Sequence, residues 1–341
     1  MPESVLVYTI YNMKKSERNK TIDLTVEEGR QYLQQCMRAE SLSAAAPADA
    51  AVSAALLQSI TDRVILGDTF QVLSQLPPAF ADLLIVDPPY NLTKDYGGEE
   101  FRKMPAKDYA DFTRKWLDLV RPLLKPTASI YVCCDWRTGI LLSPVLEEYF
   151  TLRSRITWQR EKGRGAGANW KNGMEDIWFA TVSDEYTFHV DAVRQRRKVI
   201  APYRKDGQPK DWEETEDGNF RDTCPSNFWD DISVPYWSMA ENTAHPAQKP
   251  EKLIAKLILA SSSEGDIVLD PFLGSGTTAV TAKKLNRHFV GIERSEQCCV
   301  WAQKRLEMAG EDASIQGYAD GVFWERNTGM LQKLARRGKK K

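Results

Sequence analysis

VLDPFLGSGTTAV, residues 268–280, is the stretch that decides the fold. An apolar run typical of a buried strand ends at Asp270, and Gly274 and Gly276 form a turn before a helix. Because glycine has no side chain, a ligand can approach the backbone of such a turn closely. Glu293 ends the next predicted strand, where doubly wound sheets place a carboxylate that accepts hydrogen bonds from ribose hydroxyls. The pattern therefore predicts a cofactor that contains a nucleoside.

The glycine turn alone does not choose between cofactors. Gly274, Gly276 and Ala279 also satisfy the dehydrogenase pattern G-x-G-x-x-G/A, so a nicotinamide cofactor fits these residues too. Asp270 adds information, because a carboxylate at the end of the strand can bind an amine. S-adenosylmethionine carries an α-ammonium group and dinucleotides do not. Asp270 therefore favours S-adenosylmethionine.

The chain around this turn alternates short β-branched runs with amphipathic stretches. This alternation is typical of a mostly parallel sheet covered by helices on both faces. The glycine-rich loop GRGAGANWKNG, residues 163–173, separates two extended runs that suggest an antiparallel pair. We predict strands at 64–66, 82–86, 128–133, 153–159, 176–182, 267–270 and 289–293, and helices at 107–124, 250–262, 275–285 and 296–309.

A second motif, DPPY at residues 87–90, directly follows a predicted buried strand. Open α/β sheets bind ligands at this edge. Pro88 and Pro89 have no N–H and stiffen the turn, which leaves backbone carbonyls free to accept hydrogen bonds. Asp87 and the Pro88 carbonyl can then each accept one N–H of a planar amine, and Tyr90 can lie flat against the ring that bears it.

Such a turn suits methylation of a nucleobase. The exocyclic amine of a base is a poor nucleophile because its lone pair is delocalised into the ring. Hydrogen bonds accepted from it push the nitrogen toward tetrahedral geometry, and the Asp87 carboxylate stabilises the positive charge that develops. A sulfonium methyl is already activated, so the reaction needs no metal and no nucleophilic side chain.

Composition sets the outer limits. The chain has 341 residues, a formal net charge of −1, six cysteines without C-x-x-C spacing and three scattered histidines. We therefore expect no metal site and reduced thiols. A neutral chain has no global positive field, so nucleic acid would need a local basic patch. We see no run of about 18 apolar residues that would span a membrane and no signal peptide, which predicts a cytoplasmic protein.

The order of the two motifs resembles the beta class of DNA amino-methyltransferases, in which DPPY precedes the cofactor glycines. The resemblance covers residues 63–309. It implies an α/β, Rossmann-like S-adenosylmethionine-dependent methyltransferase fold that is circularly permuted and carries an inserted target-recognition region. The domains it implies are an appendage and linker at 1–60, a catalytic half at 61–189, the target-recognition insertion at 190–243, a cofactor-binding half at 244–310 and a tail at 311–341.

The resemblance also implies a role for single residues. HPAQKP, residues 245–250, is similar to the family's segment on the cofactor side, and the strand end LGD is similar to the element that contacts the cofactor adenine. Catalysis and target-base holding fall to Asp87, Pro88, Pro89 and Tyr90. Cofactor binding falls to Asp68, Lys249, Asp270, Phe272, Gly274, Ser275, Gly276, Thr277 and Glu293.

The implied substrate is double-stranded DNA of a bacterium or phage, and the base must be flipped out of the helix to reach Asp87. The glycine-rich loop fits a flexible, cationic segment that becomes ordered on DNA, and the tail ARRGKKK is a solvated basic end within which DNA contacts are also considered. A homodimer and a companion restriction endonuclease are further partners that the resemblance allows. We expect phosphate contacts from Arg194, Arg196, Arg197, Lys198 and Arg204.

Adenine N6 is the predicted target, because Asp before Pro-Pro-Tyr is the family's habit for adenine. N4-cytosine methylation poses the same chemical problem and is the nearest alternative. Methylation of an RNA base or a protein glutamine, a nicotinamide dehydrogenase and a DNA-binding module without activity are also open. In relatives that act on RNA or glutamine, the glycine motif usually comes first, which argues against that class.

Overall fold

The computed structural model describes residues 16–42, 50–95, 100–160, 167–200, 203–215, 218–326 and 328. Three segments discussed above lie partly or wholly outside these residues. They are residues 1–15 and 43–49 of the appendage and linker, residues 163–166 of the glycine-rich loop and the basic tail at 335–341.

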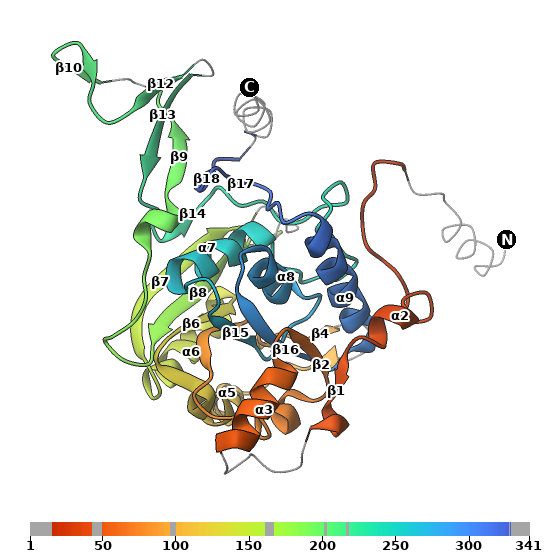
Figure 1. Cartoon of the computed structure of the whole chain (residues 1–341). Coiled ribbons are helices and arrows are strands. Elements are labelled where there is room, and N and C mark those ends of the chain that lie inside the picture. The colour runs from red at the N-terminus through yellow and green to blue at the C-terminus, as the bar shows by residue number, and fades with distance from the viewer. Residues whose placement is uncertain are drawn as a thin grey trace.

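A nine-stranded sheet forms the centre of the molecule (Figure 1). Every neighbouring pair in it is parallel except the two pairs made by β8, which runs against the others. Near-continuous apolar runs such as LLIV at 83–86 suit strands that are buried on both faces. In spatial order the strands are β1 (Met37–Arg38), β2 (Arg63–Leu66), β16 (His288–Glu293), β15 (Ile267–Asp270), β3 (Ala81–Val86), β6 (Leu124–Cys134), β8 (Met174–Thr181), β7 (Thr151–Gln159) and β14 (Phe228–Trp229).

Helices cover both faces of this sheet and make two hydrophobic cores. In α5, Tyr109, Thr113, Trp116, Leu117 and Val120 recur at helical spacing and are buried against the sheet. One face carries α2 (Arg30–Leu33), α7 (Glu251–Ser261), α8 (Thr277–Lys284) and α9 (Glu296–Glu311). The other carries α3 (Ala50–Ile60), α4 (Thr69–Leu73), α5 (Ala106–Val120) and α6 (Trp136–Glu147), with the short turns η1 (Ala39–Ser41) and η2 (Arg121–Leu123).

The architecture confirms the predicted fold class, a Rossmann-like α/β sheet. Each predicted strand and helix is present, with ends that differ by a few residues. The two extended runs flanking the glycine-rich loop form the antiparallel pair β7 and β8. The helices α4 and α6 are not among the predicted elements. The strand before the glycine turn, β15, lies directly beside β3 although 180 residues separate them in the chain.

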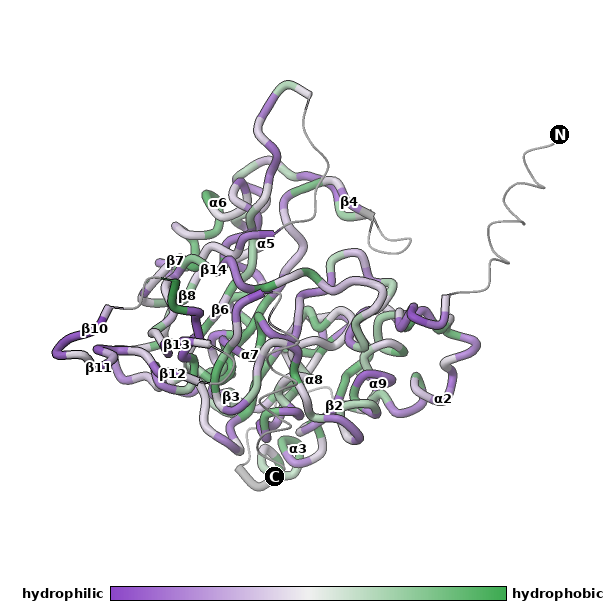
Figure 2. Tube along the Cα trace, turned by 90° about the horizontal axis from the view of Figure 1, so that it is seen from above, coloured by the Kyte–Doolittle hydropathy of each residue, from purple (hydrophilic) through white to green (hydrophobic). Residues whose placement is uncertain are grey.

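The insertion has more regular structure than its composition suggests. Its strands form an arm that projects from the main body, and Figure 2 shows hydrophilic residues along the tip. A five-stranded sheet joins β12 (Glu213–Thr215), β13 (Gly218–Thr223), β9 (Gln195–Lys198), β18 (Val322–Trp324) and β17 (Tyr318–Ala319). The hairpin of β10 (Arg204–Lys205) and β11 (Gln208–Pro209) lies beyond it, η3 (Val190–Val193) precedes it, and β4 (Lys94–Asp95) pairs with β5 (Glu100–Phe101) elsewhere.

Two segments at the ends of the chain differ from the sequence expectation. Residues 318–324, placed in the tail, pair with the insertion through β18 and β9, since Phe323 and Trp324 need apolar partners. Residues 16–42, placed in an appendage, belong to the main body. There β1 is the edge strand of the large sheet, Ile22 bridges to Thr243, and α2 packs on α9. Short apolar segments with little periodicity give no sequence signal for such long-range pairing.

The packing of α2 predicts that residues 16–42 contribute to stability. Leu33 is buried in the core shared with α9, so Leu33→Ala should lower the free energy of unfolding by about 2–5 kcal/mol. Arg30→Ala on the same helix is the control, because Arg30 is exposed. Chemical denaturation of both variants measures the difference. Equal stability of the two variants would show that this segment is a loose appendage.

Candidate active site

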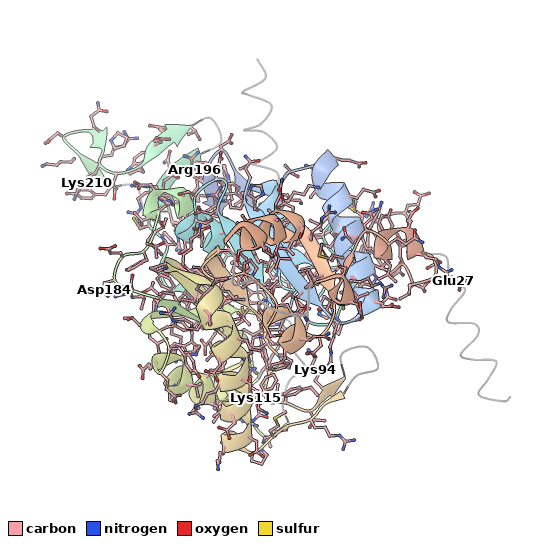
Figure 3. All side chains as sticks on the ribbon, turned by 60° about the horizontal axis from the view of Figure 1, so that its bottom comes forward. Glu27, Lys94, Lys115, Asp184, Arg196 and Lys210 are labelled. Carbon is pink, nitrogen blue, oxygen red and sulfur yellow. The ribbon has the colours of Figure 1, made fainter. Side chains whose placement is uncertain are left out.

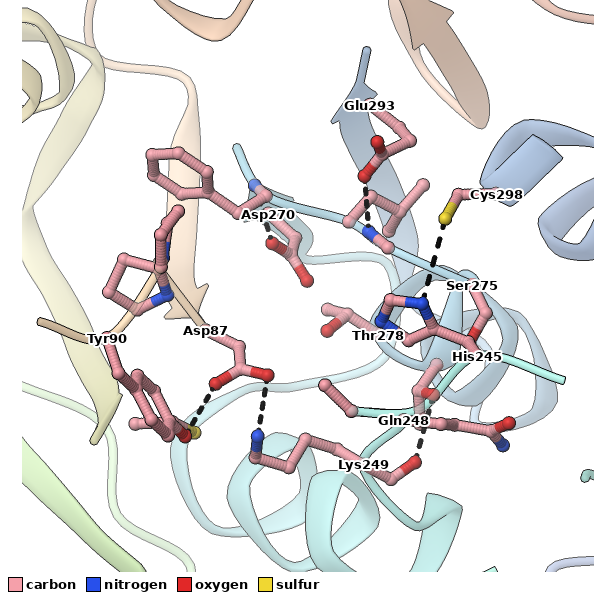
Figure 4. A pocket seen from close by; sticks show the side chains of 18 of the residues that line it. Asp87, Tyr90, His245, Gln248, Lys249, Asp270, Ser275, Thr278, Glu293 and Cys298 are labelled. Atoms are coloured by element: carbon pink, nitrogen blue, oxygen red, sulfur yellow. Dashed lines mark hydrogen bonds and ion pairs between the residues drawn. The ribbon is translucent and has the colours of Figure 1, made fainter. Parts of the chain in front are cut away.

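The residues predicted for catalysis and for the cofactor surround one pocket of about 590 Å³ (Figure 4). It opens at the carboxyl ends of β3 and β15, which lie side by side and parallel, with Leu84 opposite Leu269. Parallel pairing brings the residues that follow each strand to the same edge. The catalytic set and the cofactor set both contribute to its lining, which includes Asp68, Asp87, Pro88, Pro89, Tyr90, Lys249, Asp270, Phe272, Gly274, Ser275, Thr277 and Glu293.

Hydrogen bonds from other parts of the chain fix the backbone at and just after the end of the DPPY turn. Buried Tyr109 of α5 donates its hydroxyl to the Pro89 carbonyl at 2.9 Å. Asn91, which follows the turn, is buried and accepts from and donates to the backbone of Met104, and its own N–H donates to Thr138 Oγ1 at 3.1 Å. These bonds fix the backbone that carries Asp87. The sequence predicted a stiff turn, but the clamp by Tyr109 and Asn91 was not predicted.

Both carboxylate oxygens of Asp87 have partners within the protein. The Tyr90 hydroxyl donates to Oδ1 at 2.8 Å, and the Lys249 ammonium donates to Oδ2 at 2.6 Å. Burial, together with the charges of Asp87 and Glu175, raises the pKa of Tyr90 well above its usual value, so Tyr90 is a neutral phenol. Each carboxylate oxygen has a further lone pair, so Asp87 can still accept from an incoming amine.

Lys249 faces the catalytic side of the pocket rather than the cofactor side that the sequence predicted. Its ammonium lies between Asp87 and Glu175, at 2.6 and 3.4 Å. Only its backbone carbonyl reaches the glycine turn, where it accepts from Thr277 Oγ1. Sequence analysis missed Glu175, on β8, because a lone Glu at the start of a strand has no pattern that distinguishes it from a surface residue.

The glycine turn and Glu293 contact each other directly. Glu293 Oε2 accepts from the N–H of Gly274 at 2.7 Å, and Oε1 accepts from the N–H of Ser295 at 2.8 Å. Gly274 has φ +55°, and an added Cβ would meet the ring of His245. Burial lowers the pKa of His245 to about 4, so this ring is neutral. The carboxylate is thus fixed at the pocket wall with lone pairs left for hydroxyl groups.

Gly276 acts on packing and does not line the pocket. Its φ is +86°, and a Cβ there would approach Ala302 Cβ of α9 to 2.7 Å. Beneath the turn, buried Arg305 of α9 donates to the Ser275 carbonyl and to Thr277 Oγ1, both at 2.9 Å. Sequence analysis missed Arg305, although its position between Ala302 and Leu306 on the buried stripe of α9 was a usable signal.

Asp270 is a buried carboxyl at the end of β15. Burial raises its pKa to about 7, against hydrogen bonds from Thr278 and from the Phe272 N–H that lower it. A cation that enters the pocket stabilises the ionised form of such a carboxyl and so lowers its pKa again. The residues present therefore fit a ligand that carries an ammonium group near Asp270 and hydroxyls near Glu293.

Asp68 and Phe272, which were predicted to bind the cofactor, also line the pocket. Asp68 caps α4 by accepting from the N–H groups of Phe70 and Gln71, and its side chain also borders the pocket. The Phe272 ring packs edge-on against Trp116, which is fully buried in α5. The described residues contain no cluster of three His, Cys, Asp or Glu side chains that could hold a metal ion.

The arginines predicted for DNA lie on the arm and are paired with acids there. Arg194 donates to Asp191, Arg196 makes two bonds of 2.7 Å to Asp222, and Arg204 donates to Glu214. Figure 3 labels Arg196 on the arm and Lys210 toward its tip. Arg197 and Lys198 border a hollow of about 530 Å³ on this arm, together with Lys210, Arg221 and Tyr203. The expected cluster is therefore split, and much of its charge is internally compensated.

A family model described as DNA methylase matches residues 81–304, a range that contains both the DPPY turn and the glycine turn. The chain belongs to this DNA methylase family. It is a DNA methyltransferase, and S-adenosylmethionine is its methyl donor. This confirms the resemblance from the motif order. In the described part of the methyltransferase, no helix is long and apolar enough to cross a membrane.

Similar proteins agree with this family. The methyltransferase is 35% identical over 250 residues to the type II methyltransferase M.HpaI of Haemophilus parainfluenzae. The matched region covers 72% of this chain and 74% of M.HpaI. The chain is 32% identical over 281 residues to the DNA adenine methyltransferase YhdJ of Escherichia coli, covering 80% and 91%. The solved PvuII cytosine-N4-specific DNA methyltransferase shares the fold at a TM-score of 0.51 and 17% identity, over 74% of this chain and 92% of that one.

The state of Asp270 predicts that cofactor binding is coupled to a proton. With a pKa of about 7, Asp270 is largely protonated at pH 6, and pairing with the α-ammonium must release that proton. Affinity for S-adenosylmethionine should therefore fall between pH 7 and pH 6, by up to about tenfold per pH unit. Calorimetry in buffers of different ionisation enthalpy measures the released proton.

Asp270→Asn is the control for this measurement, because an amide cannot titrate. It should bind more weakly and lose the proton release between pH 6 and pH 7. If the wild-type protein released no proton in that range, or if the variant released as much, Asp270 would not be the group that meets the ammonium.

Proposed function

We propose that the methyltransferase transfers the methyl group of S-adenosylmethionine to N6 of adenine at a specific site in duplex DNA. The observation that carries this proposal is the position of Asp87 and Asp270 in one pocket. Asp87 lines the end of β3 and Asp270 the end of β15, with the glycine turn and Glu293 beyond. One carboxyl can thus accept from the target amine while the other meets the cofactor.

The protein's own residues prepare the amine for attack. The Asp87 side chain and the Pro88 carbonyl accept its two N–H groups, which aims the nitrogen lone pair at the cofactor side. The bonds to Tyr109 and Asn91 hold this backbone in place. The Asp87 charge also stabilises the positive charge that grows on nitrogen. When bound, S-adenosylmethionine supplies a methyl group already activated by its sulfonium sulfur.

The cofactor side of the pocket is assigned by charge and hydrogen-bonding chemistry. Asp270 suits the α-ammonium group, and Glu293 suits the ribose hydroxyls. Ser275, which is buried and has no hydrogen-bond partner for its Oγ in the described structure, adds a polar group at the turn. Phe272 and Asp68 border the place where we put the adenine ring of the cofactor.

Adenine is preferred to cytosine as the target for two reasons. The chain is 32% identical to a protein named as a DNA adenine methyltransferase over most of both lengths. The larger purine face would also gain more from stacking on Tyr90, and stacking is worth about 1–3 kcal/mol per base. The fold does not decide the base, because a cytosine-N4-specific enzyme shares it. N4-cytosine methylation is the second candidate for that reason.

A base inside a duplex cannot reach this pocket. The Asp87 side chain is one quarter exposed, and the Lys249 and Glu175 side chains behind it are buried. The target nucleotide must therefore leave the base stack, at a cost of a few kcal/mol. This requirement supports DNA contacts outside the pocket that hold the flipped state. A homodimer and a companion endonuclease stay predictions.

The arm is the part of the molecule that we assign to DNA. Lys198 and Lys210 are exposed at its hollow, and Tyr203 and Ile200 lie exposed beside them. Cations next to exposed aromatic and apolar side chains suit a phosphate backbone with adjoining sugars. Arg194, Arg196 and Arg204 can join only if phosphates displace the carboxylates that they now contact.

The first test identifies the product. Duplex DNA incubated with the protein and S-adenosylmethionine, digested to nucleosides and measured by mass spectrometry, should contain N6-methyladenine. Asp87→Ala should lower turnover at least about tenfold, because it removes a charge-assisted hydrogen bond worth roughly 1.5–3 kcal/mol. Its affinity for S-adenosylmethionine should persist. N4-methylcytosine without N6-methyladenine would contradict the adenine assignment.

A second test concerns the arm. Replacing Arg197, Lys198 and Lys210 by Ala should weaken binding to unrelated DNA sequences about equally. The slope of log K against log salt should flatten by about 0.9 for each lost phosphate contact. Lys115→Ala on α5, far from the arm in Figure 3, is the control. A triple variant with an unchanged salt slope would place this hollow away from DNA.

A further inference from the structure

A chain of alternating charges lies behind the DPPY turn. Arg160 donates to Glu175 Oε1, Glu175 Oε2 lies 3.4 Å from the Lys249 ammonium, and that ammonium lies 2.6 Å from Asp87. The Tyr90 hydroxyl lies within 3.4 Å of Glu175 as well. Figure 4 shows Lys249 reaching Asp87 from the helix side of the pocket. Glu175 is therefore the second carboxylate of the catalytic site.

The inner part of this chain is almost free of water. The side chains of Glu175 and Lys249 are only 6% and 9% exposed. Burial alone would lower the pKa of Lys249, but the charges of Asp87 and Glu175 together raise it above the usual value, so Lys249 carries its charge. Asp87, Glu175 and Lys249 then sum to one negative charge. Arg160 pairs with Glu175 at the outer end of this chain and is one third exposed, so solvent screens its charge more than the charges of the inner three.

This arrangement poses a problem for the reaction. A positive charge grows on the target nitrogen as the methyl group arrives, and an ammonium bound to Asp87 opposes that charge. It also neutralises the Asp87 charge that would stabilise the reacting nitrogen, although Asp87 keeps lone pairs for the amine. Without Glu175, the buried pair of Asp87 and Lys249 would be neutral and mutually satisfied. The site would then offer no negative charge to the reacting nitrogen.

We propose that Glu175 is a positioning residue that draws the Lys249 ammonium away from Asp87 when the target amine binds. The proposal deepens the proposed function and rests on it. The Lys249 carbonyl accepts a hydrogen bond from Thr277 Oγ1 at 3.0 Å, which fixes the backbone at this position. The Lys249 side chain is a flexible four-carbon stem, and its ammonium already lies between the two carboxylates. A small rotation therefore exchanges the partner of the ammonium, and Asp87 keeps its full charge for the amine.

A purely structural role for Glu175 makes a different prediction. Glu175 is near the start of β8 and pairs with Arg160 just after β7, so it could simply fasten that hairpin. Loss of a fastening contact lowers stability, and a second loss at Lys249 would lower it further. If Glu175 instead balances the charge of Lys249, the second substitution has the opposite effect. Removing Lys249 from a protein that lacks Glu175 then restores the single negative charge.

A double-mutant cycle separates the two roles. Wild type, Glu175→Gln, Lys249→Met and the double variant are compared by single-turnover transfer of labelled methyl groups to duplex DNA. This readout is independent of which base is methylated. Glu148→Gln is the matched control, because it removes a carboxylate paired with an arginine outside the pocket. Thermal unfolding and calorimetry with S-adenosylmethionine show that each variant is folded.

We expect Glu175→Gln to slow transfer at least about tenfold with little change in DNA affinity, and Glu148→Gln to leave it unchanged. The double variant should be faster than Glu175→Gln alone. A double variant that is no faster, or a Glu175→Gln variant as fast as the control, overturns the proposal. If Glu175→Gln does not fold, the same cycle is run with Glu175→Asp, whose shorter side chain keeps the charge but reaches less far, and the same reversal is expected. Methylation of cytosine by the wild type would contradict the adenine assignment and leave this cycle valid.

Discussion

The parallel pairing of β3 with β15 is the constraint on which the active site depends. Leu83 and Leu84 lie opposite Val268 and Leu269, so both strands end at the same edge of the sheet. Asp87 and Asp270 follow those ends, and the pocket between them is bordered by two turns with little freedom. One turn is stiffened by proline and clamped by Tyr109, and the other is braced from below by Arg305. The catalytic geometry is thus built into the hydrogen-bonded core.

The protein buries several charged side chains around and beneath the pocket. An isolated ion in a protein interior is strongly destabilising, and a buried pair gains little net stability over apolar packing. The sequence nevertheless buries Glu175, Lys249 and Asp270 around the pocket and Arg305 and Glu251 beneath it. Within the pocket the buried charges pair with one another, and under the glycine turn Arg305 donates to the Ser275 carbonyl, the Thr277 hydroxyl and the Glu251 carboxylate.

The arm is attached to the main body by strand pairing and buried contacts. Strand β9 from the insertion pairs with β18 from beyond α9, and Phe323 is fully buried between them and the main body. Asp231 of the insertion also pairs with buried Lys252 and Lys256 of α7 in the main body. Arg194, Arg196 and Arg204 contact carboxylates of the arm itself, so much of its positive charge is compensated internally.

The sequence by itself determined the fold class, the strands and helices around the pocket, and the residues at both turns. These follow from local patterns, such as the apolar run before DPPY and the glycines after Asp270. Only the tertiary structure decided the partners of Lys249, Glu175 and Arg305, and the positions of residues 16–42 and 318–324. Those depend on contacts between segments far apart in the chain, and a single charged residue or a two-residue strand has no periodicity that would reveal its partner.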